Sequence, residues 1–530
     1  MQRIFIQPTL VLSLTLSFGA CSTLPERAAV IPSYSQNIDT QNTDLAYLTQ
    51  KFKQQYPYKT GYHVLYEPNE ALIRRLHLIE HAEKSLDLQY YIWENDKVGA
   101  LALAGLLKAA DRGVQVRLLI DDNNSKNLEA AYYALAQHPN IQIRLFNPSK
   151  FRNLRALDFV LDFNRMTRRM HNKTFIVDHQ VALIGGRNMS DQYYNVGDSF
   201  QFADMDVILI GQTVPDITSS FDEYWNHDYA YPVAQLSQHK ASRLSYDNLR
   251  DQLTTHRQKH EQQYYADLAK TELNILKKFT QPNFFNWVDA KVVKDSADKI
   301  RSDYANEYHV GFQLLNLLQP QKQMDLVSAY FVPEQVNIER IKALQESGVN
   351  IRVLTNSFMA NDVAVVHAFY AKYRKDLLLN GVELYEFFPT LPSALIKSGG
   401  GSLNPFTQKN SSKQKSSNAM SNSSLHAKFM ALDQEKVFIG SFNFDPRSAY
   451  LNTEIGVVLD SPTLATDIHQ QMNQNLMKYA YRVELDDKGQ LQWRQRQGQQ
   501  DIIHRQEPLM KWWHKLGLKV ISWLPIEKQM

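Results

Sequence analysis

The chain has 530 residues, which is too long for a single hydrophobic core and indicates two to four domains. Hydrophobic residues make up 44% of the chain and charged residues 21%, which argues against a disordered protein and a polytopic membrane protein. Lys plus Arg number 58 and Asp plus Glu 55, so the formal net charge of +3 gives no global attraction to nucleic acid, and no nucleic-acid partner is expected.

Residues 1–21 are typical of an export signal that ends at the one cysteine of the chain. Arg3 precedes the apolar run PTLVLSLTLSFGA, and Gly19 and Ala20 stand directly before Cys21, as in a bacterial lipobox whose cysteine is lipidated after cleavage. The alternatives are an uncleaved signal anchor and a buried first helix. We therefore expect a protein of the bacterial cell envelope, attached to the membrane and facing the periplasm. A single cysteine also excludes an intramolecular disulfide and a cysteine-based zinc site.

Changes in composition divide the rest of the chain. The polar residues 22–55 predict a tether, and the Gly/Ser/Asn/Lys-rich residues 391–424 predict a mobile insert, because neither stretch can bury much apolar surface. Apolar residues at helical spacing in LAKTELNILKKF indicate a helical connector. The predicted units are a first domain at 56–235, the connector at 236–310, a second domain at 311–480 that contains the insert, and a tail at 481–530 with an amphipathic Trp/Lys helix.

An internal repeat is the main feature of the sequence. Residues 171–188 read HNKTFIVDHQVALIGGRN, and residues 426–443 read HAKFMALDQEKVFIGSFN. Upstream, LDLQYYIW and GVQVRLLIDD in the first half correspond to MDLVSAYFV and GVNIRVLTNS in the second, each pair read as strand, helix, strand. The chain is therefore predicted to be a duplicated α/β unit. The residues matched at identical spacing are His171, Lys173, Asp178 and Asn188 with His426, Lys428, Asp433 and Asn443.

Strand alternation gives each copy of the motif a local structure. Positions 171 and 173 point to one face of a strand, so the histidine and lysine project together. The runs TFIV and VALIGG predict two short buried strands in a β-hairpin with its turn at Asp178. Asp178 and Asp433 are then close to the turns, where we expect them to tie the loop rather than act as general bases.

Two histidines, two lysines and two asparagines brought together suit a phosphodiester. Its anionic oxygens can be neutralised by lysine ammonium groups and oriented by asparagine amides. One histidine can attack phosphorus while the other protonates the leaving alkoxide and then deprotonates the incoming alcohol, roles that suit a side chain with a pKa of about 6.5. This chemistry requires no metal or other cofactor, and the residues themselves leave open which histidine attacks.

A nucleophilic histidine needs a carboxylate that fixes its second ring nitrogen, so an acidic residue is expected after each motif. Asp204 in ADMDVILIG follows the first motif, with Asp206 as the less favoured choice, and Glu454 in NTEIGVVLD follows the second. The alternative is that these acids merely flank strands at the surface.

Twin H-x-K-x-x-x-x-D motifs, each followed by G-[GS]-x-N, resemble the phospholipase D superfamily. That resemblance implies two α/β domains packed about a pseudo-two-fold axis, one shared active site and a covalent phosphohistidine intermediate. It makes His171 the nucleophile and His426 the acid and base. The motif residues it implies are the catalytic set His171, Lys173, Asp178, His426, Lys428 and Asp433, with Asn188, Asn443, Gly186, Ser441, Asp204 and Glu454 as phosphate-binding or supporting residues.

Longer stretches, among them YYIWENDKVG, RMHNKTFIVD and FIGSFNFDPRSAYLNTEIG, resemble the type C group of bacterial cardiolipin synthases over roughly residues 60–525. This resemblance implies transfer of a phosphatidyl group to phosphatidylglycerol, with phosphatidylethanolamine as donor, so the expected partners are these phospholipids and the membrane surface. Two alternatives use the same residues: a hydrolytic phospholipase D that releases phosphatidic acid, and a nucleic-acid phosphodiesterase, against which the balanced charge argues. Whether an auxiliary protein takes part is left open.

Three further features are consistent with a lipid substrate, and each has a structural alternative. The arginines between residues 152 and 169 can gather phosphates or form a solvated basic face. The C-terminal MKWWHKLGLKVISWLPIEK can form an interfacial helix or pack its aromatic residues on the catalytic domains. His367 and Arg447 are candidate substrate-binding residues, and the alternative for His367 is a histidine that packs a helix.

Overall fold

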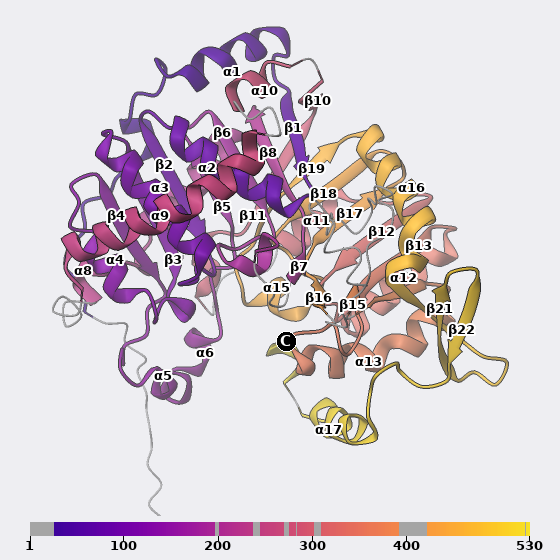
Figure 1. The fold of residues 1–530 in the computed structure, drawn as a ribbon. Helices are drawn as coiled ribbons and strands as arrows, with labels where there is room; N and C mark the ends of the chain where they lie inside the picture. Colours follow the sequence, from indigo (N-terminus) through magenta and orange to yellow (C-terminus); the bar gives the residue numbers. More distant parts are fainter. Residues whose placement is uncertain are drawn as a thin grey trace, which may run out of the picture.

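The computed structural model describes residues 26–196, 201–236, 244–269, 275–281, 283–301, 309–388, 390–391, 421–524 and 526–529. The predicted signal segment with Cys21, and most of the predicted insert at 391–424, lie outside the described residues. The described chain forms two α/β halves, one on the left and one on the right of Figure 1, each built on a large sheet with helices against it.

The first half is built on a sheet of the order β10-β1-β8-β6-β5-β2-β3-β4-β9. Its strands are β1 (Thr60–Leu65), β2 (Ser85–Tyr90), β3 (Gln115–Asp121), β4 (Ile141–Phe146), β5 (Thr174–Val177), β6 (Val181–Gly185), β8 (Asp206–Gly211), β9 (Ala230–Pro232) and β10 (Asn286–Val288). Its helices are α1 (Asp44–Gln55), α2 (Pro68–His81), α3 (Lys97–Asp111), α4 (Glu129–Leu135), α5 (Arg155–Leu161), α6 (Phe163–Met166), α7 (Val214–Asn226), α8 (Val233–Leu236), α9 (Tyr246–Ala269) and α10 (Ile275–Phe279).

The second half is built on a sheet of the order β11-β19-β18-β17-β12-β13-β14-β20-β21-β22. Its strands are β11 (Ala290–Lys294), β12 (Gln323–Ser328), β13 (Asn350–Asn356), β14 (Glu383–Phe387), β17 (Lys428–Leu432), β18 (Lys436–Gly440), β19 (Ile455–Asp460), β20 (Ala480–Leu485), β21 (Leu491–Gln497) and β22 (Gln500–His504). Its helices are α11 (Val310–Leu317), α12 (Glu334–Glu346), α13 (Ala364–Leu379), α15 (Pro446–Tyr450), α16 (Pro462–Tyr479) and α17 (Trp512–Ser522).

The two sheets repeat one order of strands, which confirms the predicted duplicated α/β fold. The run β1-β8-β6-β5-β2-β3-β4-β9 of the first sheet matches β11-β19-β18-β17-β12-β13-β14-β20 of the second, strand for strand. In both sheets the three neighbouring strands β2-β3-β4 or β12-β13-β14 are parallel, and the strands on either side pair antiparallel. The parallel strands are mostly buried, and the charges that two of them carry in each sheet are paired with each other, Arg117 with Asp87 and Arg352 with Asp325.

One apolar core is common to both halves. Ile176 and Val207 of the first sheet belong to the same buried cluster as Phe429 and Val457 of the second, and α7 and α16 contribute apolar side chains to it. Because this core has no solvent layer between the halves, it fixes their relative position. The two motif hairpins, β5-β6 and β17-β18, are thereby brought to the interface.

Residues 26–55 pack on the first half, and the predicted free tether is wrong for this stretch. α1 starts after Thr43, whose side chain accepts the N–H of Ala46, and Leu45 is fully buried. Upstream, Ser35 donates its backbone N–H and its hydroxyl to the carboxylate of Asp222. The polar composition misled because these polar side chains are hydrogen-bonded to the domain instead of to water.

The predicted helical connector contains two sheet strands as well as helices. α9 lies against α3 of the first half (Figure 1), which agrees with the helical spacing of that stretch. Further on, β10 pairs antiparallel with β1, β11 pairs antiparallel with β19, and Asp289 separates β10 from β11. The chain therefore crosses from one sheet edge to the other at Asp289.

The tail adds strands and a helix to the second half. β20 pairs with β14, the hairpin β21-β22 extends the sheet, and α17 follows as an amphipathic helix with no buried residue. In the part of the chain that the structure describes, no helix has the length and apolar character needed to span a bilayer.

Candidate active site

The two motifs fold as the predicted β-hairpins. β5 pairs antiparallel with β6, and β17 with β18. At the turn of the first hairpin, the Asp178 carboxylate accepts the backbone N–H groups of residues 83, 84 and 85 at 2.8–3.0 Å. Asp433 does the same for residues 321, 322 and 323 at 2.5–2.8 Å. Each aspartate ties a loop to the turn of its hairpin. The histidine lies at the other end of the same strand, so the grouping of the aspartates with the catalytic residues does not fit the structure.

Backbone pairing across the interface brings the motif entries together. Residues 423–425 in β16 (Ser421–Leu425) run parallel to residues 201–203 in β7 (Gln201–Ala203), and the N–H of His426 donates to the carbonyl of Ala203 at 2.7 Å. In the matching place of the other repeat, the N–H of His171 donates to the carbonyl of Thr453 at 3.0 Å. Each motif is therefore bonded to the strand entry of the opposite repeat, next to an acidic residue.

The two histidines exchange carboxylates between the repeats. Nδ1 of His171 lies 2.9 and 3.0 Å from the two carboxylate oxygens of Glu454, and Nδ1 of His426 lies 2.6 Å from Oδ2 of Asp204. The sequence singled out both acids but assigned each to the motif that it follows in the chain. That assignment is wrong, because the parallel pairing at the interface carries each acid to the histidine of the other repeat. The site therefore exists only when both halves are docked.

Burial sets the protonation state of His171. Burial lowers the pKa of His171 to about 4, against the opposing effect of Glu454. Burial would raise the pKa of Glu454, but His171 and Lys173 outweigh it and hold this pKa below its ordinary value. At neutral pH a neutral imidazole therefore donates Nδ1–H to a carboxylate, and the lone pair of Nε2 is free to act as a nucleophile.

His426 is held in a more basic environment. Burial lowers its pKa well below the ordinary value, and Lys428 and Lys173 lower it further. Burial also raises the pKa of Asp204, against the effect of Lys428. Both shifts disfavour charge on the pair, and an anionic phosphate next to the lysines would favour the imidazolium again. His426 is thus suited to gain a proton when an anionic substrate binds.

The two motif lysines lie directly behind the histidines. Nζ of Lys173 donates to the carbonyl of His171 at 2.6 Å, and Nζ of Lys428 donates to the carbonyl of His426 and lies 3.0 Å from its Nδ1. Burial lowers the pKa of Lys173 to about 7 and lowers that of Lys428. The expected phosphate contact of the lysines remains a prediction, since both side chains are almost fully buried and the described cavity wall is formed by their neighbours.

The asparagines of the motifs line the cavity between the repeats. Oδ1 of Asn188 accepts the N–H of Ile92 at 3.0 Å, and its amide donates to the hydroxyl of Tyr193 at 2.8 Å. Oδ1 of Asn443 is buried and has no hydrogen-bond partner in the described structure. The contacts of Asn188 fix the orientation of its amide.

The two small motif residues support the carboxylates. A Cβ at Gly186 would lie 2.2 Å from Oδ1 of Asp204, so glycine is what allows this carboxylate its place. At the equivalent position, Ser441 donates its hydroxyl to Glu454 at 2.5 Å, and Ser448 donates to the other oxygen at 2.9 Å. In the first repeat, glycine leaves room for the carboxylate, and in the second repeat, serine donates a hydrogen bond to it.

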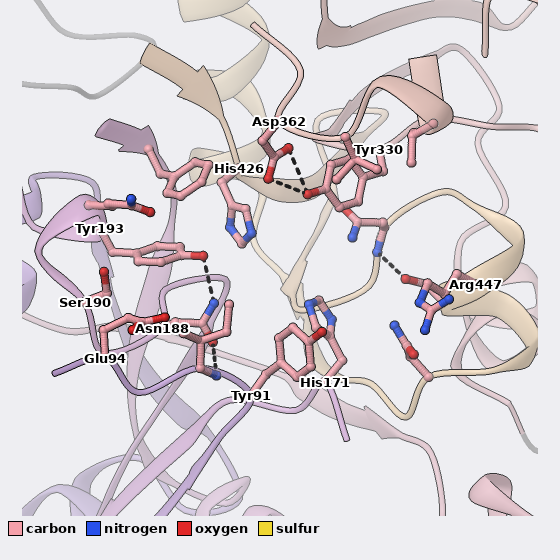
Figure 2. A pocket seen from close by; sticks show the side chains of 18 of the residues that line it. Tyr91, Glu94, His171, Asn188, Ser190, Tyr193, Tyr330, Asp362, His426 and Arg447 are labelled. Carbon is pink, nitrogen blue, oxygen red and sulfur yellow. Dashed lines mark hydrogen bonds between the residues drawn. The ribbon is translucent and has the colours of Figure 1, made fainter. Parts of the chain in front are cut away.

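Both histidines face one cavity of about 690 Å³ at the interface. Figure 2 shows the two imidazoles reaching toward this space, with Tyr91 close to His171 and Tyr193 close to His426. The volume is enough for a phosphodiester headgroup and the hydroxyl that replaces it. Further lining residues are Glu94, Asp191, Tyr330, Asp362, Asp445, Arg447 and Asn452.

Several lining residues were not singled out from the sequence. Tyr91 packs edge-on against the ring of His171, and the hydroxyl of Tyr330 donates to Asp362 at 2.8–2.9 Å. Both tyrosines follow the end of a parallel strand, a position from which side chains commonly reach a site. Asp445 lies before Pro446 as the N-cap of α15, and this Asp-Pro start of a helix was a usable signal.

The two weak substrate-binding candidates differ in their outcome. Arg447 lines the cavity and donates to the carbonyl of Gln529 at 2.9 Å. His367 is fully buried, lies 2.9 Å from Glu507 and contacts Arg374 at 3.1 Å, so it is a packed helix residue and does not reach the cavity.

Three of the arginines before the first motif form neither a phosphate-gathering face nor a solvated basic face, the two alternatives that the sequence left open. Arg155 contacts Glu129 at 3.1 Å, Arg165 pairs with Asp162, and Arg169 contacts Asp121 at 3.2 Å. Their guanidinium groups point into the first half, where buried carboxylates neutralise them. The charges of these three arginines are therefore neutralised within the first half.

The fold and the site define an enzyme that acts on phosphodiesters with two histidines at the interface of a duplicated α/β unit. The model of the family described as "Cardiolipin synthase, PLD-like domain" matches residues 76–225 and 314–476, and the chain belongs to this family.

Known proteins resemble the chain over most of its length. "Cardiolipin synthase C" of Escherichia coli strain K12 is 38% identical over 475 residues, which cover 89% of this chain and 97% of that protein. An uncharacterized protein of Helicobacter pylori strain 26695 is 31% identical over 78% of this chain and 80% of its own. The crystal structure of phosphatidylserine synthase from Haemophilus influenzae Rd KW20 has a TM-score of 0.53 and 12% identity, and covers 89% of this chain and 95% of that one, a likeness of fold.

Proposed function

We propose that this protein is a cardiolipin synthase that transfers a phosphatidyl group to phosphatidylglycerol through a phosphohistidine. Membership of the cardiolipin synthase family and 38% identity to the Escherichia coli enzyme support this function. The observation that carries the mechanism is the arrangement of His171 and His426, which face one cavity while Glu454 and Asp204 hold their Nδ1 atoms.

In the first step, Nε2 of His171 attacks the phosphorus of the donor phospholipid. A P–N bond forms, the P–O bond to the headgroup breaks, and the leaving oxygen takes a proton from His426. The headgroup alcohol leaves, and Glu454 stabilises the positive charge that develops on the ring of His171. The phosphatidyl group is then bound covalently to the enzyme.

In the second step, the free hydroxyl of phosphatidylglycerol attacks the phosphohistidine. His426, now neutral, takes the hydroxyl proton as the P–O bond forms and the P–N bond breaks. Cardiolipin leaves, and both histidines return to their starting states. Water in place of this hydroxyl would give phosphatidic acid, so acceptor selection in the cavity separates a synthase from a hydrolase.

We further propose phosphatidylethanolamine as the donor. The cavity wall carries Glu94, Asp191 and Asp362, whose carboxylates complement an ammonium headgroup. Phosphatidylglycerol as both donor and acceptor is the competing case, and its neutral glycerol headgroup has no such complement.

Product analysis by mass spectrometry tests the function and the donor. Purified protein receives phosphatidylglycerol with or without headgroup-labelled phosphatidylethanolamine, beside the variants His171→Ala and His426→Ala. We expect cardiolipin together with labelled ethanolamine, and neither from the variants. Cardiolipin from phosphatidylglycerol alone would make that lipid the donor, and phosphatidic acid without cardiolipin would make the protein a hydrolase.

Residues 1–21 are proposed to attach the protein to the periplasmic side of the cell envelope, through lipid on Cys21 or as a signal anchor. Metabolic labelling with a tagged fatty acid tests the first case. Label on the wild type and none on Cys21→Ser would establish lipidation, and an unlabelled protein that still carries residues 1–20 would establish the anchor.

A further inference from the structure

The segment of residues 151–163, which contains α5 and the start of α6, exposes an unusual number of large apolar side chains. Val160 is 77% exposed and Leu154 65%. Scattered apolar residues are normal on a protein surface, but a contiguous group of this kind marks a contact site. We call this group the first apolar patch: Phe151, Leu154, Leu157, Phe159, Val160, Leu161 and Phe163.

The polarity of this segment is reversed with respect to an ordinary surface helix. Charged residues of this segment point inward: Asp158 accepts the N–H of Phe151 at 3.0 Å, and Arg155 donates to the carbonyl of Asp122 at 2.6 Å. Directly after the segment, Arg165 also points inward and donates to the carbonyl of Pro148 at 2.9 Å. An amphipathic helix normally buries its apolar face and exposes its charges. Here the fold fixes the charges and leaves the apolar face to an external partner.

A second exposed group lies on α17 in the other half. Trp512 and Trp523 are each 72% exposed. Lys511 lies 5.0 Å from the ring centre of Trp513, and Lys519 lies 5.7 Å from that of Trp523, so cations alternate with aromatic rings. The second apolar patch consists of Trp512, Trp513, Leu516, Val520, Trp523 and Leu524.

The two patches flank the active-site cavity. Arg447, which lines the cavity, donates to the carbonyl of Thr167, directly after α6, and to the carbonyl of Gln529, a few residues after α17. In Figure 1, α5 and α6 on one side and α17 on the other lie toward the same lower end of the molecule. A flat apolar partner could therefore contact both patches at once.

From this geometry we infer that the first and second apolar patches dock together on the lipid bilayer, so that the cavity between them opens onto the membrane surface. The inference rests on the proposed function in so far as a lipid substrate requires such an opening. Tryptophan alternating with lysine is suited to the headgroup region, where rings lie in the apolar boundary and cations meet anionic headgroups. Because one patch lies on each half, contact of both patches with the bilayer would place the cavity between the halves at the membrane surface.

Site-specific fluorescence tests the contact itself. The full-length chain with Cys21→Ser has no thiol, so Val160→Cys, Leu516→Cys and Leu379→Cys each give one position for an environment-sensitive dye. Leu379 is a matched control because it is 72% exposed at the end of α13, whose opposite end carries the cavity-lining Val363 and Val366. The vesicles contain equal parts of phosphatidylethanolamine and phosphatidylglycerol, with or without nitroxide-labelled acyl chains.

We expect the dyes at 160 and 516 to shift to the blue and to be quenched by nitroxide, and the dye at 379 to do neither. Quenching at one of the two positions alone would overturn two-point docking. A chain that binds vesicles with both dyes unquenched would assign the binding to residues 1–21 and the patches to a protein partner, which also overturns it.

Activity provides the second arm. Leu154→Asp with Val160→Asp should lower cardiolipin formation on vesicles by about tenfold or more, and change it by less than about twofold on lipids dispersed in detergent. An equal loss in both assays, or no loss in either, would contradict the inference. If the wild type makes no cardiolipin in either form, the proposed function fails while the quenching result still stands.

Discussion

The two motif histidines come from matching sequences but lie in unlike environments. Nδ1 of His171 faces both oxygens of Glu454, which Ser441 and Ser448 hold in place. Nδ1 of His426 faces one oxygen of Asp204 and also lies 3.0 Å from the ammonium of Lys428. In the proposed mechanism, the first environment would stabilise an imidazolium that forms during attack, and the second would resist one until substrate binds. The duplication gives the two histidines matching positions, while their different surroundings suit them to different proposed roles.

The strands that follow the two motif hairpins, β8 and β19, also differ between the repeats. Asp206 on β8 pairs with Arg75 at 2.7 Å and Arg187 at 3.3 Å, which gives the first half a buried ionic cluster. By strand register its counterpart is Gly456, where a Cβ would lie 2.2 Å from the ring of Phe438. The first repeat thus fills this position with a buried ionic cluster, and the second fills it with a closely packed aromatic ring. The fold requires the space to be filled but does not require a particular type of side chain.

Substitution of the two histidines should give the largest loss of activity and the clearest difference between the repeats. With a p-nitrophenyl phosphodiester, whose leaving group needs no proton, we expect His426→Ala still to form the covalent adduct and to accumulate it, with turnover lower by about 10²–10⁴. His171→Ala should form no adduct and lose turnover by about 10⁴ or more. Burst kinetics and mass spectrometry of the intact protein measure both effects. An adduct in His171→Ala but not in His426→Ala would reverse the two roles.

Substitution of the exchanged carboxylates tests which histidine each one serves. Glu454→Gln should slow the burst with the p-nitrophenyl substrate by about 10²–10⁴, because the amide no longer fixes Nδ1–H or stabilises the imidazolium. Asp204→Asn should leave the burst almost unchanged and slow the later turnover, in which His426 acts as base. Rapid-quench measurements separate the two phases, and the opposite pattern would mean that each acid serves its own repeat.

The turn aspartates should affect stability and leave chemistry intact. Asp178→Ala deprives three backbone N–H groups of their acceptor in a fully buried place, at a cost of about 3 kcal/mol, and the half-exposed Asp433→Ala should cost about 1–2 kcal/mol. Thermal unfolding should rank the variants in that order, with Asn at either position intermediate. A normal unfolding midpoint with reduced kcat would instead return these aspartates to the catalytic set.

The pH profile gives the smallest expected effect. The lowered pKa of His171, about 4, keeps the ring neutral at pH 5, so kcat/KM for the p-nitrophenyl substrate should fall on the acid side near pH 4. The pKa of Lys173, about 7, places the loss of its charge on the alkaline side. Between pH 5 and 7 the change should be about twofold or less. An acid limb near the ordinary histidine value of about 6.5 would show that burial does not control His171.

Sequence patterns predicted most of the features that are local to one repeat. The short apolar runs TFIV and VALIGG, joined by a turn, predicted the hairpin, and the turn position of Asp178 predicted that this residue ties the loop. Both features depend on residues near in the chain or on strand geometry. The repeat predicted a duplicated α/β unit, and the structure adds the order of strands that the two sheets share.

The missed features depend on contacts between distant segments. The exchange of Glu454 and Asp204 follows from the docking of the halves, which no spacing within a repeat encodes. The inward pairing of Arg155 with Glu129 required the position of a helix that the sequence does not specify. The packing of Ser35 on Asp222 was hidden by polar residues that look alike whether they bond to protein or to water.

The exchanged carboxylates also order events during synthesis of the chain. The amino-terminal half can fold while the rest is still being made, since domains commonly fold as they emerge. It then contains His171 but lacks Glu454, which lies 283 positions further along the chain. A nascent chain on the ribosome therefore carries an incomplete and inactive site. The site becomes complete only after nearly the whole protein has emerged and the two halves have docked.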